Sequence, residues 1–169
     1  MSVLFYGRAF PPANFGKKTM NTNNTNTTAI AAPILVIGGN GRTGKRIVQT
    51  LKELRIPVRV GSRSGAPSFD WTNRSTWAPA LEGMKAVYIS YQPDLAVEGA
   101  AGDIQCLAEL AAKAGIQKLV LLSGRGEPEA QACEEIIQQS GIDHTILRCS
   151  WFFQNFRDLE LILQSFQFQ

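Results

Sequence analysis

Cysteine and histidine are scarce in this sequence, and none of them is spaced as a metal ligand. Three cysteines (Cys106, Cys133 and Cys149) lie far apart without a CxxC pair, and His144 is the single histidine. The sequence therefore predicts no metal site. An odd cysteine count without a secretory signal favours reduced thiols in a cytoplasmic protein, with buried structural cysteines preferred over a reactive thiol.

Long hydrophobic runs are also absent. No apolar segment reaches the roughly 18 to 20 residues that span a bilayer, so we expect no membrane segment and no membrane partner. The 44% apolar content of the 169 residues instead fits a globular protein with one core.

Acidic residues are missing from the first 52 positions, which hold seven Lys or Arg residues. The remainder has 10 basic residues against 14 acidic ones, a balance of −4, and no polybasic patch. Duplex nucleic acid is therefore not an expected partner. Positive charge near the glycines described below would instead bind one small ligand.

Residues 1–32 form an N-terminal extension with a low-complexity polar run from Met20. Such a composition buries too little apolar surface to offset its ordering entropy, so we expect disorder. Two interpretations stay open: an organelle transit peptide, or an upstream extension before a natural start at Met20.

From residue 33 onward, strand and helix patterns alternate. Apolar runs predict strands at 34–37, 58–61, 67–71, 86–90, 119–122 and 144–147. Helices are expected at 42–55, 73–81 (with Asn73 as N-cap), 95–114 and 128–139, and a last apolar helix at 157–166. Residues 33–169 are thus predicted to form one α/β Rossmann domain: a doubly wound parallel sheet, strand order 3-2-1-4-5-6, with helices on both faces.

The stretch PILVIGGNGRTG joins the first strand to the first helix and carries Gly38, Gly41 and Gly44 at intervals of three. Glycines at such a junction let a phosphate approach the free amides of the helix N-terminus. We interpret it as a pyrophosphate cradle; the alternative is a tight turn whose glycines serve packing alone.

The end of the second strand favours NADP(H) over NAD(H). It reads Gly61-Ser62-Arg63-Ser64, without the carboxylate that would accept from ribose hydroxyls. Arg63, with Arg42 from the glycine turn, could bracket a 2′-phosphate, and Ser64 could donate to it. The alternative is that both arginines are solvated surface charges.

Further polar side chains follow the later strands. Asp70 could accept from an adenine amino group, or it could make a turn with Trp71 in the core. Ser123, followed by Gly124, could touch the cofactor or polarise a substrate carbonyl, or it could cap the next helix.

The segment 34–156 resembles the NmrA-like branch of the atypical short-chain dehydrogenases/reductases, most of all the festuclavine and agroclavine dehydrogenase group. The resemblance rests on the motifs GGNGRTG, SRS, FDW, KLVLLSGRG and SGIDHTILRCSWFFQNF. It implies a Rossmann fold that binds NADP(H). The implied contacts are Gly38, Gly41, Arg42, Thr43 and Gly44 at the phosphates, Arg63 and Ser64 at the 2′-phosphate, and Ser90, Tyr91, Ser123 and Cys149 near the nicotinamide.

The sequence departs from typical short-chain dehydrogenases at their Tyr-x-x-x-Lys pair, which supplies a general acid/base. Glu127 and Gln131 occupy the corresponding positions and cannot replace it, so the catalytic residue is unknown; His144 is interpreted as structural. Two functions follow. One is an NADP-dependent oxidoreductase that transfers hydride to a small apolar carbonyl, imine or conjugated double bond. The other is a non-catalytic NADP(H) redox sensor acting on a regulatory protein partner.

Relatives in this family continue beyond the sixth strand into a lobe that closes the substrate cleft. Trp151, Phe152 and Asn155 are the candidate substrate-lining residues before the chain stops at Gln169. We expect a truncated product that lacks this lobe; the alternative is an exposed apolar C-terminal helix through which the chain self-associates.

Overall fold

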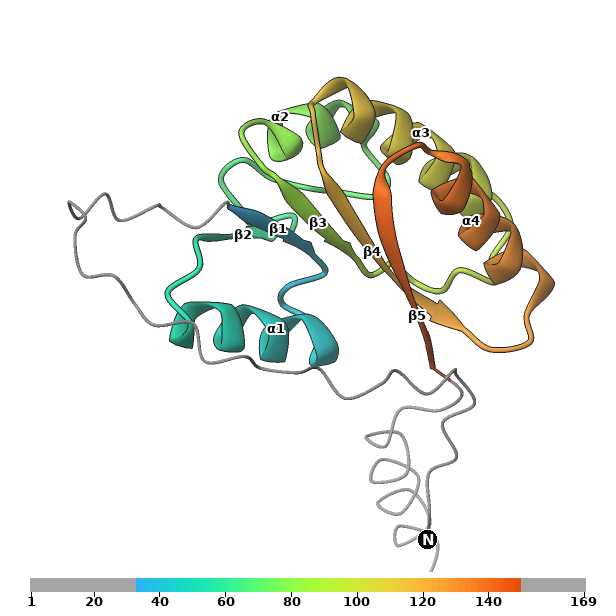
Figure 1. The fold of residues 1–169 in the computed structure, drawn as a ribbon, viewed down its shortest axis with the longest axis horizontal. Helices are drawn as coiled ribbons and strands as arrows, with labels where there is room; N and C mark the ends of the chain where they lie inside the picture. The colour runs from blue at the N-terminus through green and yellow to red at the C-terminus, as the bar shows by residue number, and fades with distance from the viewer. Residues whose placement is uncertain (1–32, 150–169) are drawn as a thin grey trace, which may run out of the picture.

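The computed structural model describes residues 33–149, which form a five-stranded parallel sheet in the order β2-β1-β3-β4-β5 (Figure 1). Every strand pair in that sheet is parallel. The strands are β1 (Ile34–Ile37), β2 (Val58–Gly61), β3 (Ala86–Ile89), β4 (Lys118–Gly124) and β5 (Asp143–Cys149).

Helices cover both faces of the sheet. Helix α1 (Arg42–Glu53) lies on one face, and α2 (Trp77–Leu81), α3 (Ala100–Lys113) and α4 (Pro128–Gln139) lie on the other (Figure 1). A short 3-10 helix, η1 (Arg74–Thr76), leads into α2, and Asn73 caps it by accepting from the Ser75 amide. These layers confirm the predicted Rossmann architecture.

The two faces of the sheet carry cores of different size, because alternate strand residues point to opposite faces. On the α2–α4 face, Leu35 and Ile37 of β1 join a large cluster with Trp77, Ile104 and Leu119. On the α1 face, the buried cluster of the described residues is limited to Val36, Val48 and Tyr88. Most of the apolar stabilisation of the described domain therefore lies on the α2–α4 face.

The strand order places a topological switch point between β1 and β3. The chain leaves β1 toward β2 on one side of it and later returns to β3 on the other. In open α/β sheets a ligand crevice opens at the carboxyl ends of the strands at such a point. The loops after β1 and β3 meet there.

One predicted strand is absent from the sheet, and the remaining five keep their predicted order. Residues 67–71 make only an isolated antiparallel bridge between Asp70 and Asn73. The Phe69 amide donates to the Ser62 carbonyl, which turns the segment back on its own loop. Proline at position 67 offers no amide for a strand ladder.

Helix α3 begins at Ala100 and not at position 95 as predicted. Gly99 precedes it with φ +90°, in the left-handed region that interrupts a right-handed helix. The residues before it form a turn in which Asp94 Oδ1 accepts from the Ala96 amide. The predicted helix at 128–139 coincides with α4.

Several predictions lie outside the described residues: the disorder of residues 1–32, the helix at 157–166, and the roles of Trp151, Phe152 and Asn155. Among the helices of residues 33–149, none is both long enough and apolar enough to cross a membrane.

Candidate functional site

The turn between β1 and α1 is close-packed around its three glycines. Gly38 has φ +73°, which side-chain-bearing residues rarely adopt. A Cβ on Gly44 would contact the Gly38 carbonyl oxygen and lie 2.7 Å from the Gly39 Cα. The helix therefore starts directly against the turn.

The N-terminus of α1 is electrostatically suited to an anion. Its N-cap is Gly41, which offers no side-chain cap, and the first turn contains no acidic residue. The first amides of a helix have no intrahelical acceptor, and the dipole adds positive potential there. Arg42 and Lys45, both exposed, add basic charge at this end. An anion at the turn would offset this concentration of positive potential.

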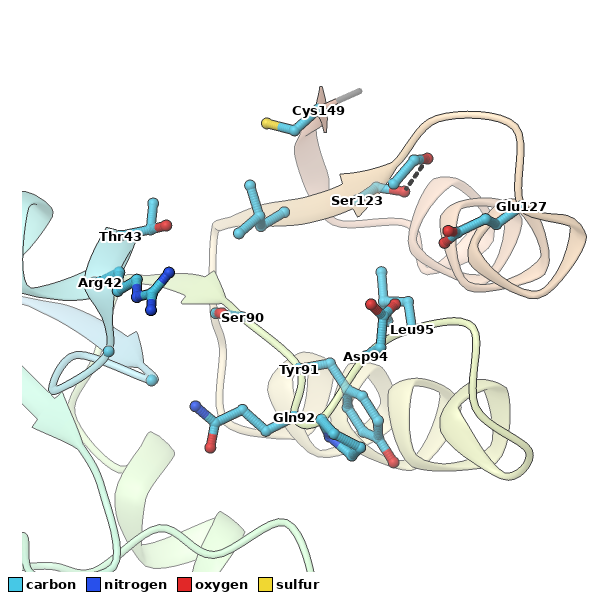
Figure 2. A pocket seen from close by; sticks show the side chains of 16 residues that line it. Arg42, Thr43, Ser90, Tyr91, Gln92, Asp94, Leu95, Ser123, Glu127 and Cys149 are labelled. Atoms are coloured by element: carbon cyan, nitrogen blue, oxygen red, sulfur yellow. Dashed lines mark hydrogen bonds between the residues drawn. The ribbon is translucent and has the colours of Figure 1, made fainter. Parts of the chain in front are cut away.

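Two cavities flank the glycine turn and share Gly38, Gly41, Gln92 and Pro93 in their linings. The first has a volume of about 450 Å³ and runs from the turn to the ends of β3, β4 and β5 (Figure 2). The second, of about 760 Å³, runs from the turn to the end of β2. A ligand with a central anionic group at the turn could occupy both.

The second cavity brings together the residues predicted to select NADP(H). Arg63, Ser64 and Asp70 all line it, with Ser62. Asp70 Oδ1 accepts from the backbone amide of Thr72 at 3.0 Å and from its hydroxyl at 2.9 Å. These two hydrogen bonds lower the pKa of Asp70. The carboxylate is therefore ionised, and its Oδ2 can accept a hydrogen bond from a ligand.

Aromatic rings form one wall of the same cavity. Trp71 lines it and packs edge-on against Phe69 and Trp77, with ring centroids 4.9 and 5.3 Å away. Trp77 is fully buried and donates to the Asp70 carbonyl. The stretch is thus a turn with aromatic residues in the core, and Asp70 and Trp71 also line the cavity; the adenine contact of Asp70 stays a prediction.

The first cavity contains the remaining predicted residues of the described chain. Arg42, Thr43, Ser90, Tyr91, Ser123, Gly124 and Cys149 line it. Sequence reasoning did not assign Gln92, Pro93, Asp94 and Leu95 to the site, and placed Glu127 only by alignment. Gln92 to Leu95 follow β3, so their position opposite the glycine turn could have identified them.

Tyr91 directs its hydroxyl away from the cavity (Figure 2). That hydroxyl donates to Asp103 Oδ2 of α3 at 2.8 Å. Burial and this hydrogen bond raise the pKa of Tyr91 to about 12. Burial likewise raises the pKa of Tyr88 to about 12, and its hydroxyl lies in the core beneath α1 without a partner in residues 33–149. Neither tyrosine is placed as a general acid.

Ser123 does not cap α4, whose N-cap is Glu127. Its hydroxyl donates to Glu134 Oε1 at 2.5 Å, and Arg148 donates to Glu134 Oε2 through Nε at 2.8 Å and Nη2 at 2.6 Å. Burial acts to raise the pKa of Glu134, but the hydrogen bonds from Arg148 and Ser123 hold it below its usual range. A buried, ionised carboxylate thus lies directly behind Ser123.

Glu127 and Gln131 have different surroundings. Glu127 lines the cavity, and its Oε2 lies 2.7 Å from where a Cβ on Gly124 would be. Gln131 is exposed on α4 and lines neither cavity. His144 lies near the amino end of β5, whereas the site is at the carboxyl ends of the strands, and its Nδ1 is 3.2 Å from the Ile142 carbonyl oxygen. It lines neither cavity, in keeping with a structural role.

Comparison with known proteins gives relatives among the clavine dehydrogenases. Over 138 residues the chain is 32% identical to agroclavine dehydrogenase of Claviceps fusiformis, covering 73% of this chain and 48% of that protein. No family model matches the sequence. The chain spans about half the length of the curated relatives it matches.

Solved structures share the fold. The NADPH-dependent quinone oxidoreductase of Escherichia coli, solved with NADPH, aligns with a TM-score of 0.62 at 20% identity over 74% of this chain and 51% of that one. A short-chain dehydrogenase/reductase superfamily protein of Agrobacterium tumefaciens, solved with NAD, aligns with a TM-score of 0.56 at 22% identity over 69% of this chain and 48% of that one. The sequence relatives confirm the resemblance to the clavine dehydrogenase group, and the solved structures confirm the Rossmann architecture.

Proposed function

We propose that this chain, a homologue of the clavine dehydrogenases, binds NADP(H). We infer that it belongs to an oxidoreductase that transfers hydride to a small apolar carbonyl, imine or conjugated double bond. The single observation that carries this proposal is the pair of cavities meeting at the glycine turn. A dinucleotide has the matching form, with two nucleoside halves joined by a pyrophosphate.

The residues present fit that cofactor. The close approach of α1 to the turn leaves no room for a Cβ at Gly44, as expected for the third glycine of a dinucleotide-binding turn, which packs the helix against the strand. Gly41, Arg42, Thr43 and Gly44 would hold the pyrophosphate. Arg63 and Ser64 would hold a 2′-phosphate in the second cavity, beside Asp70 and Trp71.

When bound, the cofactor supplies the hydride chemistry. The chain's own residues bind and orient it. Ser90, Leu122 and Cys149 enclose the first cavity from the ends of three adjacent strands, while Asp94 and Glu127 lie at its far side (Figure 2). In the described residues no tyrosine hydroxyl is placed to donate a proton, so a substrate already activated for hydride transfer is the one that fits.

The lack of a tyrosine hydroxyl placed as a proton donor in the described residues also supports a second candidate function. A protein that binds NADP(H) without a positioned acid could sense the reduced or oxidised cofactor and act through a protein partner. The cofactor site is common to both functions, and turnover distinguishes them.

A titration tests the cofactor assignment. Trp71 lines the second cavity, so NADPH and NADH can be titrated by intrinsic tryptophan fluorescence. We expect tighter binding of NADPH, and Arg63→Ala should weaken it about tenfold or more while leaving NADH nearly unchanged, because a charge-assisted bond to phosphate is removed. The matched control is Arg46→Ala, an exposed residue of α1 that lines neither cavity.

Equal affinity for NADPH and NADH would contradict the 2′-phosphate assignment. Oxidation of NADPH, followed at 340 nm across enones, quinones and imines, then separates the enzyme from the sensor. Tight binding without oxidation of any of them would favour the sensor.

A further inference from the structure

Glu134 is the most deeply buried carboxylate of the described chain, and nothing in the proposed function uses it. Glu134 is 2% exposed and lies on the side of α4 that packs against the sheet. Both carboxylate oxygens are engaged, one by Ser123 and one by Arg148. A buried charge is costly unless it is paired, so this arrangement calls for an explanation.

The hydrogen-bond chemistry of Ser123 follows from this contact. A serine hydroxyl has one proton to donate and two lone pairs that accept. The 2.5 Å distance to Glu134 is typical of a hydroxyl donating to a carboxylate. A carboxylate held ionised by Arg148 can only accept, so the proton of Ser123 lies on the Glu134 side. Ser123 can offer only lone pairs to the cavity that it lines.

This excludes one role considered for Ser123 from the sequence. Polarising a substrate carbonyl requires a donated hydrogen bond, and the only proton of this hydroxyl is already committed. The alternative acceptor, the Gly124 carbonyl oxygen, lies 3.3 Å away and is uncharged. The cavity group that pairs with Ser123 must therefore be a donor.

We propose that Glu134 is a positioning residue that makes Ser123 a dedicated hydrogen-bond acceptor, and that Ser123 accepts from the carboxamide N–H of a nicotinamide ring. This rests on the proposed function. With phosphates at the glycine turn, the carboxamide is the polar group of the nicotinamide half that lies farthest from them. Ser123 lies across the cavity from Arg42 and Thr43, where such a group would arrive (Figure 2).

The test compares NADP⁺ with its 3-acetylpyridine analogue, in which a methyl group replaces the carboxamide nitrogen. Both keep the carbonyl oxygen, and only NADP⁺ can donate. Measured by calorimetric titration, the unsubstituted chain should bind NADP⁺ about tenfold more tightly than the analogue. Ser123→Ala should reduce that ratio to about one.

Glu134→Gln tests the positioning role itself. A glutamine at this position would turn its oxygen toward the Arg148 guanidinium and its NH₂ toward Ser123. Ser123 would then accept from glutamine and could turn its own O–H toward the cavity as a donor. The preference for NADP⁺ should fall to about one although the hydroxyl is still present. Glu135→Gln, on the neighbouring exposed position of α4, should keep the tenfold ratio.

The outcomes separate this inference from the proposed function. If neither dinucleotide binds, the proposed function fails. If both bind equally to the unsubstituted chain, or if Ser123→Ala keeps the tenfold ratio, the inference alone is overturned. A ratio that stays tenfold in a folded Glu134→Gln variant would overturn the positioning role. Circular dichroism establishes that each variant is folded, and should Glu134→Gln not fold, the Ser123→Ala ratio decides.

Discussion

The two polar ends of the first cavity differ in whether their charges are already paired within the protein. At the β1–α1 end, the helix begins without a side-chain cap or an acidic residue, and basic side chains gather at its positive pole. At the β4–α4 end, a buried carboxylate is satisfied by a serine on one side and an arginine on the other. One end is arranged for an incoming anion, while the other has paired its charge internally.

The packing of the sheet follows the same division. The α2–α4 face holds the large core that fixes β3, β4 and β5, while the α1 face holds a small cluster. In the proposed complex, the larger core supports the strands that line the far end of the first cavity, and the glycine turn would hold the middle of the ligand. The proposed binding mode therefore depends on the close-packed turn and on the orientation of Ser123, in addition to Arg63 and Ser64 in the second cavity.

Adding a side-chain atom where α1 packs against the glycine turn should have the largest effect. In Gly44→Ala the new Cβ would meet the backbone of Gly38 and Gly39, which cannot move as a flexible side chain can. We expect the free energy of unfolding to fall by about 1 to 3 kcal/mol and dinucleotide binding to be lost, measured by urea denaturation and by titration.

Gly102→Ala is the matched control, because nothing lies within 4 Å of a Cβ at that position in α3. Alanine is favoured over glycine in a helix by up to about 1 kcal/mol, so this variant should be as stable as the parent or more stable. A Gly44→Ala chain that keeps parental stability and affinity would contradict the close-packed turn.

The β4–α4 end should weaken in acid. The folded-state pKa of Glu134 is lowered, so its contribution to stability is complete above its unfolded pKa of about 4.3 and is lost as pH falls through the folded value. Urea denaturation between pH 6 and pH 3 should show a steeper loss for the parent chain than for Glu134→Gln. Parallel curves would contradict a buried ionised Glu134.

The smallest effect is expected at an ion pair outside the site. Lys118 Nζ lies 2.8 Å from Asp143 Oδ2, but the Asp143 side chain is 74% exposed. Exposed pairs contribute roughly 0 to 1 kcal/mol. Lys118→Met should therefore change the free energy of unfolding by less than about 1 kcal/mol, and a larger change would weaken the contrast between surface and buried pairs.

The fold could be predicted from the sequence because each strand and helix has a local signal. Strands β1 and β2 and helix α4 appear at the expected residues, and Asn73 acts as the expected cap. The stretch at 67–71 misled the prediction because its aromatic residues look like those of a strand. In the structure they pack on one another and on Trp77 instead of joining the sheet.

The glycine turn and the basic end of β2 could also be recognised, since both are written in consecutive residues. The pairing of Ser123 with Glu134 could not, because it joins positions 11 residues apart through tertiary packing. The same holds for Tyr91, whose hydroxyl is taken by Asp103 on α3. The sequence predicted which polar residues lie near the site. The direction in which each side chain points became clear only from its hydrogen-bond partners in the structure.

The central claim is that one dinucleotide spans both cavities with its pyrophosphate at the glycine turn. Amide ¹H–¹⁵N spectra recorded during an NADP⁺ titration test it most directly. The largest shifts should occur at residues 41–44, with further shifts at 62–64 and at 123–124. Shifts that spare 41–44, or that centre on the groove between α3 and α4 around Gln105 and Gln139, would contradict it.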